Sequence, residues 1–506
     1  MKFSRCDALA LACCAFYLLL GSAWITWPGL QADEVLFAQP LFDPGATAES
    51  ISIFHHMVPL MLMSYLGCLK TLLYAPLFAL FGTGAAVVRL PMITAGALTI
   101  WIIYRIVAKV HSERAGAIVA VLLSTDTLYL WLSRCDWGPV TLQHLLAAGA
   151  VWMLLRFRTH PQRAAWLAGG FFLFGLALWD KTVFLWPAAG LLTGAALLGR
   201  EIRPLFTARR VALALVFFAL GAFPWIRYNV RQHGNTFSET GHFTTEDSWR
   251  KAENLVKDLN GDSLLGYMIR ERGPEGQPVD AAASAAISTA RALGFPRQSI
   301  TGWLFLACLA ASAFLGRAPR IAALMLAAAF LLMALTRGGG MWSYHAVVLW
   351  PLPQLVIAFA LVRLPKALLV ATLAVTALAA LAVTNTHFAL LHLYGGSPIW
   401  SDAVYDLPAA LGPLATKEMP IQVLDWGILE PMQLLSQGKL PIQSAIDRKA
   451  ITPGAIYVGH LPGAEALPDS NTRLAEDARL AGCTLRVLKI VSDRHGTPVY
   501  QLQRCD

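Results

Sequence analysis

Apolar segments about as long as a bilayer is thick recur through the first 384 residues of this chain. A transmembrane helix needs roughly 20 consecutive apolar residues. Only 14% of the 506 residues are charged, whereas soluble proteins average about a quarter. The sequence therefore predicts a polytopic α-helical membrane protein. Eleven spans are expected, at about 8–27, 86–107, 115–133, 139–156, 164–179, 183–199, 211–228, 299–316, 320–336, 345–362 and 366–384.

The Lys and Arg residues between these spans predict the orientation, because cytoplasmic loops collect such residues. With a cytoplasmic N-terminus, every short loop on that side is net positive or balanced. The first apolar segment is longer than a signal-peptide core, and its small-residue cleavage candidate, Gly21-Ser22-Ala23, lies inside it. We therefore expect a retained first helix in the bacterial inner membrane, with the C-terminal part of the chain in the periplasm.

Two domains are expected: a membrane domain over 1–384, with outer loops at 28–85 and 229–298, and an outer domain over 385–506. In the outer domain, strand-like runs such as AIYVGH and PVYQLQRC alternate with helix-like runs such as RLAEDARLAG. This alternation predicts a small α/β domain. Cys483 and Cys505 fall within it, where oxidation is feasible, and the sequence leaves their pairing open.

The two outer loops are also expected to contain helices. In the first, the stretch HHMVPLMLMSYLGCLKTLLYAPLFALFG is predicted to form interfacial helices or a re-entrant pair, interrupted by Pro59, Gly67 and Pro76. In the second, SWRKAENLVKDL has the spacing of an amphipathic helix.

Charged residues gather at the outer ends of the spans. Asp33 and Glu34 follow the first span directly, where an unpaired buried carboxylate would be costly. Each could equally be a solvated or interfacial side chain, as is normal for snorkelling Arg and Lys. Opposite charges in very short turns favour a cavity that binds a phosphate and moves a proton. Other members of this set are Arg134 with Asp136, Asp180 with Lys181, and Arg337 with His345.

Several segments occur in an order that is typical of one enzyme class. ADEVLFA lies in the first outer loop, and LFALFGTGAAVVRLP leads into the second span. SRCDW follows the third span, GLALWDK precedes the sixth and FPWIRYN ends the seventh. Through about residues 8–235 the chain resembles the GT-C class of integral-membrane glycosyltransferases. The branch it resembles most contains the protein O-mannosyltransferases and the lipid A aminoarabinose transferases, which are glycosyltransferase family 39-like.

This resemblance implies a hexosyl or pentosyl transferase that takes its sugar from a polyprenyl phosphate on the outer face of the membrane. The first-loop motif, Asp33 and Glu34, would supply the catalytic base or orient the acceptor. Transfer would invert the sugar, with cations stabilising the departing phosphate. The supporting residues would be Asp136, Asp180 and His345. The candidate phosphate ligands are Lys181 and Arg134, followed by Lys70, Arg89 and Arg337.

One position departs from the pattern of the resembling family. Where the aminoarabinose transferases have a Lys-Pro-Pro stretch, this chain reads YLGCLKTLLYAP, so Lys70 matches only in part. No cofactor is expected, and the chain has no nucleotide-binding signature or nucleic-acid motif. A divalent metal held by His55, His56 or His345 is left open, although the sequence offers no ligand spacing for it.

The expected partners are membrane lipids, the lipid-linked donor and an acceptor that is a lipid, a polysaccharide or a protein. The alternative function is a transporter or flippase for a lipid-linked or anionic substrate, which would place charges near the midplane. A non-catalytic scaffold is a third reading. The charges of this chain sit at span ends on one face, which favours the transferase.

Overall fold

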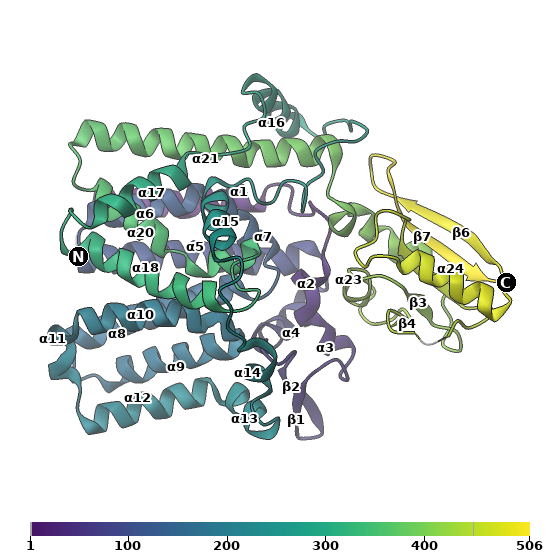
Figure 1. Cartoon of the computed structure of the whole chain (residues 1–506), viewed down its shortest axis with the longest axis horizontal. Coiled ribbons are helices and arrows are strands. Elements are labelled where there is room, and N and C mark those ends of the chain that lie inside the picture. Colours follow the sequence, from purple (N-terminus) through teal and green to yellow (C-terminus); the bar gives the residue numbers. More distant parts are fainter. Residues whose placement is uncertain (1–2, 449) are drawn as a thin grey trace.

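A bundle of long helices and a smaller sheet domain make up the computed structural model, which describes residues 3–448 and 450–506 (Figure 1). The sheet domain carries the C-terminus and lies at one end of the bundle. Helix α23 (Leu429–Leu435) of the sheet domain packs against the short helices α2 (Ala32–Val35) and α3 (Gln39–Phe42), which follow the first span. One hydrophobic core, including Val35 and Leu434, joins the two regions.

Helices that could cross a membrane form the bundle, which confirms the polytopic helical fold. Among the described residues, five single helices are long and apolar enough to span a membrane, and the number rises to nine if each bent pair is one span. Every span expected from the sequence overlaps one of these elements or one of the shorter apolar helices α9 (Ala164–Asp180) and α17 (Thr301–Ser312). The single helices are α1 (Arg5–Ser22), α5 (Ala85–Val110), α8 (Val140–Thr159), α18 (Arg317–Leu335) and α21 (Lys366–Tyr394).

Four spans in the described part of the chain are bent, and the residues at three of the breaks explain the bend. Asp126 separates α6 from α7 because its side chain accepts a hydrogen bond from the Tyr129 N–H, which caps the new helix. Pro224 and Pro351 stand at two other breaks, where proline cannot continue the hydrogen-bond ladder. The pairs and their angles are Glu113–Thr125 with Thr127–Cys135 (62°), Thr182–Leu197 with Gly199–Leu205 (78°), Ala208–Gly221 with Phe223–Arg231 (73°) and Ser343–Leu349 with Leu352–Leu361 (50°).

The first outer loop contains a β-hairpin where helix was expected. Strand β1 (Glu49–Ile53) pairs antiparallel with β2 (His56–Met61), so the prediction of interfacial or re-entrant helix over HHMVPLM was wrong. Phe54 and His55 connect the strands with φ of 47° and 66°, the left-handed values that tight two-residue hairpins require. The C-terminal half of the predicted stretch does form a helix, α4 (Leu69–Phe81).

The second outer loop contains the amphipathic helix that its spacing predicts. Helix α15 (Ser248–Asn260) buries Leu255 and Leu259 against the bundle and exposes Trp249. It contacts α17 and the short helix α19 (Ser343–Ala346). Two further helices in this loop are α14 (Asn235–Thr240) and α16 (Ala281–Ala292).

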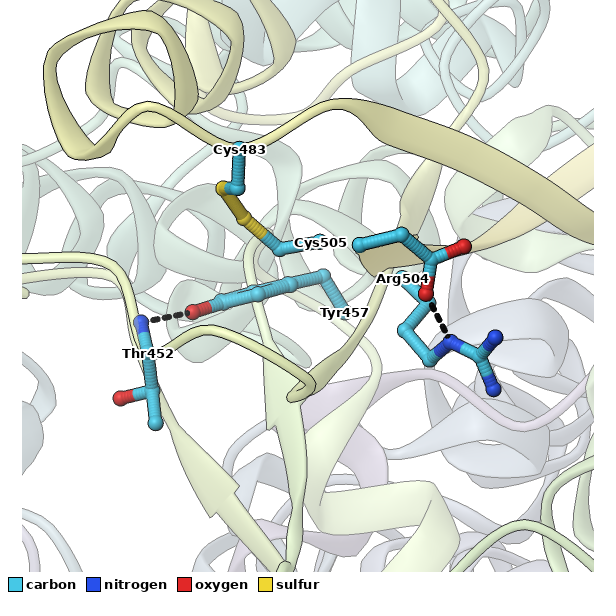
Figure 2. Close-up of a disulfide and its surroundings, with 6 residues drawn as sticks. Thr452, Tyr457, Cys483, Arg504 and Cys505 are labelled. Atoms are coloured by element: carbon cyan, nitrogen blue, oxygen red, sulfur yellow. Dashed lines mark hydrogen bonds and ion pairs between the residues drawn. A yellow bond between two sulfur atoms is a disulfide. The ribbon is translucent and has the colours of Figure 1, made fainter.

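The C-terminal domain is the small α/β domain that the sequence predicts. Its sheet has the order β4-β3-β5-β7-β6, with β3 parallel to β4 and β5 and the other pairs antiparallel. A disulfide joins Cys483 to Cys505 and ties the start of β6 to the end of β7 (Figure 2). The remaining elements are β3 (Ile421–Val423), β4 (Ile442–Ser444), β5 (Ile456–His460), β6 (Leu485–Ser492), β7 (Pro498–Cys505), α22 (Leu407–Leu411) and α24 (Ser470–Ala481).

Candidate active site

The two adjacent carboxylates of the first outer loop have different surroundings. Helix α2 begins after Gln31, whose side chain accepts a hydrogen bond from the Glu34 N–H at 3.2 Å. Glu34 is buried, and Arg89 Nε and Nη2 donate to its two oxygens at 2.6 and 2.9 Å. Arg89 also donates to the carbonyl oxygens of Ile25, Pro28 and Gly29. This pair therefore holds the loop that follows α1, and it gives Glu34 a positioning role.

Asp33 faces a different set of groups. Burial raises the pKa of the Asp33 carboxyl above its ordinary value, while the Lys181 ammonium and a Gln31 hydrogen bond act in the opposite direction. The Asp33 charge also acts on the hydroxyl groups of Tyr65 and Tyr267. A partly buried carboxylate beside a cation, in aromatic surroundings, has the properties of a general base.

Lys181 is the cation beside Asp33. It lies where α9 ends, and only 4% of its surface is exposed. Its Nζ lies 5.3 Å from the centre of the Tyr344 ring, and a Cβ added to Gly138 would come within 2.7 Å of it. No hydrogen bond or ion pair engages this ammonium within the described part of the chain. An ammonium that is largely removed from water and forms no hydrogen bond within the described residues is suited to bind an anion.

Lys70 and Asp136 form a second buried pair close to Lys181. Lys70 Nζ donates to Asp136 Oδ2 at 2.9 Å, and Asp136 Oδ1 accepts from the Thr141 N–H at 2.9 Å. Asp180 is buried near both, and neither of its carboxyl oxygens has a hydrogen-bond partner among the described residues. The predicted residues Lys70, Asp136 and Asp180 therefore come together near Lys181. The charge of Lys70 is already neutralised by Asp136.

Arg134 lies apart from this cluster and has its donors engaged. Its guanidinium donates to the carbonyl oxygens of Gly21 (2.7 Å), Ala23 (2.5 Å), Trp24 and Trp27 (2.6 Å to Nη2). These contacts fasten the C-terminal end of α1 and leave fewer donors for a phosphate. The phosphate role of Arg134 therefore stays a prediction, and Lys181 is the stronger candidate on geometry.

Two further predicted residues lie toward the loop after α18. The side chain of Arg337 is exposed, whereas His345 packs edge-on against Trp186, with 5.6 Å between the ring centres. Histidines 55 and 56 are exposed in the β1–β2 turn. No group of three or more His, Cys, Asp or Glu residues is arranged to hold a metal ion within residues 3–448 and 450–506.

Sequence reasoning missed several residues that surround Asp33. Tyr65 and Tyr267 come from two separate loops, Tyr344 comes from the short helix α19, and Glu430 comes from α23 of the C-terminal domain. The charge of Asp33 and burial both raise the pKa of Glu430, with burial the larger cause. No charge pairing or spacing marks these positions, because only the packing of distant loops brings them to the site.

Breaking the Arg89–Glu34 pair will destabilise the protein. Arg89→Met leaves the buried Glu34 carboxylate without its partner, and such a loss costs about 3–5 kcal/mol. Arg231→Met is the matched control, because the Arg231 side chain is exposed and its partner Glu49 keeps the ion pair with Arg227. We expect this loss to cost about 1 kcal/mol or less. Unfolding of both variants in detergent will measure the difference, and equal stabilities would contradict the positioning role.

Part of the chain matches a known protein family. Residues 69–228 match the family model described as dolichyl-phosphate-mannose-protein mannosyltransferase. This segment contains Lys70, Arg89, Arg134, Asp136, Asp180 and Lys181. No curated protein sequence matches the chain significantly.

Two solved structures resemble the whole chain. The crystal structure of ArnT from Cupriavidus metallidurans bound to undecaprenyl phosphate has a TM-score of 0.58 at 15% identity, with 97% of both chains covered. The same protein in the apo state has a TM-score of 0.59 at 14% identity, with 99% of this chain and 98% of that chain covered. The shared fold extends through the membrane bundle and the C-terminal sheet domain. The family match and the shared GT-C fold together indicate a polytopic membrane glycosyltransferase.

Proposed function

We propose that this protein transfers a sugar from a polyprenyl-phosphate donor to an acceptor at the outer face of the cytoplasmic membrane, with inversion at the sugar carbon. The observation that carries the proposal is the buried Lys181 ammonium, which has no hydrogen bond or ion pair in the described chain and lies beside the Asp33 carboxylate. The undecaprenyl phosphate bound to the ArnT of similar fold supports a lipid-phosphate donor.

Asp33 acts as the base in this reaction. Its carboxylate takes the proton from an acceptor hydroxyl as that oxygen forms a bond to the anomeric carbon. The bond from the anomeric carbon to the phosphate oxygen breaks on the opposite face, and polyprenyl phosphate leaves with the bonding electrons. Attack and departure on opposite faces invert the configuration.

Lys181 stabilises the charge that grows on the departing phosphate. A cation that binds this charge more strongly in the transition state than in the ground state accelerates the reaction. Lys70 contributes less, because Asp136 already neutralises it. Arg89 and Glu34 hold the Asp33 loop in place.

The orientation follows from the position of the site and from the charge pattern of the loops. Asp33 lies at the end of the bundle that contacts the C-terminal domain, since α2 packs on α23. The Lys and Arg residues of the opposite loops support a cytoplasmic location for that opposite end. The reaction would therefore take place on the periplasmic side, where the sugar of a translocated donor is exposed.

Release of polyprenyl phosphate tests the proposal. Purified protein in detergent is incubated with polyprenyl phosphate that carries mannose, glucose, arabinose or aminoarabinose, together with lipid, polysaccharide and peptide acceptors. Acceptor-dependent release from one donor supports the proposal. Binding of these lipids without release, combined with their movement across proteoliposomes, would favour the transporter.

The acid side of the pH profile will report the ionisation of Asp33. Burial raises the pKa of Asp33 above its ordinary value, and the base works only when it is ionised. Activity will therefore be present above this pKa and fall as the pH drops through it. We expect the acid limb of kcat/KM to lie above the range of an ordinary aspartate, at about 3.9. A rate that stays flat down to that range would contradict the assignment.

A further inference from the structure

A cavity of about 240 Å³ lies beside the Asp33 site, between α15 and the loop that precedes α19. Drug-sized ligands occupy cavities of about 300–1,000 Å³, so this one suits a single ring. It does not suit a lipid chain. The residues that line the cavity include Trp137, Asp258, Ser263, Tyr267, Trp342 and Tyr344.

The walls of this cavity have the composition of a saccharide site. Trp137, Tyr267 and Trp342 form a continuous aromatic group, with ring centres 6.4 and 6.2 Å apart. Flat aromatic faces pack well on the C–H faces of a sugar ring, while polar atoms around them bind its hydroxyl groups.

Three polar atoms on these walls form no hydrogen bond of ordinary geometry in the described part of the chain. They are Asp258 Oδ2, Ser263 Oγ and the Trp137 indole N–H. The Ser263 and Ser343 hydroxyl groups nevertheless lie close enough to Asp258 to lower its pKa. Asp258 is only 2% exposed, and a buried polar atom is expected to have a hydrogen-bond partner. Burial raises the pKa of Asp258 to about 7, so this carboxyl can accept or donate a hydrogen bond near neutral pH. A ligand with several hydroxyl groups would satisfy this set.

The cavity adjoins both the proposed base and the proposed phosphate cation. Tyr344 lies over Lys181, and Asp33 acts electrostatically on Tyr267 and Tyr344. Trp137 precedes Gly138, whose N–H donates to the Asp33 carbonyl oxygen at 3.4 Å and whose Cα lies against Lys181. In an inverting transfer the anomeric carbon stands between the base and the phosphate. The ring attached to that carbon must therefore occupy a space that touches both.

We infer that this cavity is the donor-sugar subsite, in which Asp258 binds a hydroxyl or amino group of the sugar and Trp342 covers one face of the ring. The inference rests on the proposed function, since it assumes a lipid-phosphate sugar donor. Asp258 thereby becomes a specificity residue, because the group that it binds distinguishes one sugar from another.

Equilibrium binding to the purified full chain tests this subsite without any acceptor. The probes are bare polyprenyl phosphate and the same lipid carrying mannose, glucose, arabinose or aminoarabinose. We expect wild type to bind one sugar lipid more tightly than the bare lipid. Asp258→Asn will reduce that preference about tenfold, which is the effect of losing one charged hydrogen bond. It will change the affinity for the bare lipid little.

Two further variants separate the subsite from effects on folding. Trp342 is half exposed, so Trp342→Ala is expected to fold and to reduce the same preference. Trp249→Ala is the matched control, because Trp249 is exposed on α15 and lies outside the cavity lining. Its preference for the sugar lipid will equal that of wild type.

Each contrary result has its own meaning. If Asp258→Asn keeps the full preference, or if wild type binds all the lipids equally, the subsite is wrong while lipid-phosphate binding still supports the proposed function. If wild type binds no lipid phosphate at all, the proposed function fails, and the subsite inference fails with it.

Discussion

Asp33→Asn will lower the rate of sugar transfer by about a thousandfold, within the range of about 10²–10⁴ for loss of a general base. Asparagine keeps the size of the side chain but cannot take the acceptor proton. Asp33 lies in a short helix that Gln31 caps and that the neighbouring Glu34–Arg89 pair holds, so the fold is expected to persist. Release of polyprenyl phosphate by purified protein will measure kcat, and equilibrium binding will show that the donor is retained.

The matched control for this variant is Asp43→Asn. Asp43 lies in the same outer loop and is exposed, and its carboxyl accepts a local hydrogen bond from the Gly45 N–H. We expect wild-type turnover from it. Equal turnover by wild type and Asp33→Asn would make Asp33 structural and would move the base to another carboxylate, for which Glu430 is a candidate.

Lys181→Met will lower kcat by about 10²–10³-fold, comparable to the loss of one preorganised donor in an oxyanion site. Methionine has a similar length and fits a buried position, but it carries no charge to stabilise the departing phosphate. Lys181→Arg restores the charge and should recover part of the rate, although its planar group requires more room. The exposed Lys417→Met in the C-terminal domain is the control for the loss of a lysine.

The pH profile of Lys181→Met separates this role from a purely structural one. The Lys181 charge lowers the pKa of Asp33 against the effect of burial. Removing the charge will raise that pKa, so the acid limb of the remaining activity will move to higher pH. A reduced rate with an unmoved acid limb would show that Lys181 does not act on Asp33.

The spans could be predicted from the sequence because the bilayer imposes a local requirement. Each span must be long and apolar in itself, whatever it packs against. The same reasoning failed over β2 (His56–Met61), where a short apolar run is compatible with helix and with strand. Pairing with β1, which the run does not contain, decides its conformation.

The charged residues of the site could also be selected from the sequence, since membrane-level charges are rare and usually have a partner. The partners of these charged residues could not be predicted from the sequence. Arg134 and Lys181 looked alike as basic residues beside an acid. In the structure, carbonyl oxygens at the end of α1 engage Arg134, whereas the Lys181 ammonium lies beside Asp33 without a hydrogen bond in the described chain.

The sequence by itself determined the class of protein, the helices of the bundle and the set of outward charges, because hydropathy and charge are properties of single residues and short segments. Only the tertiary structure decided that the Lys181 ammonium has no hydrogen bond within the described residues, that Glu34 pairs with Arg89, and that Tyr267, Tyr344 and Glu430 lie within the electrostatic influence of Asp33. These facts depend on contacts between loops far apart in the chain. Burial and hydrogen bonding, which set the chemistry of each charge, exist only after those loops have packed.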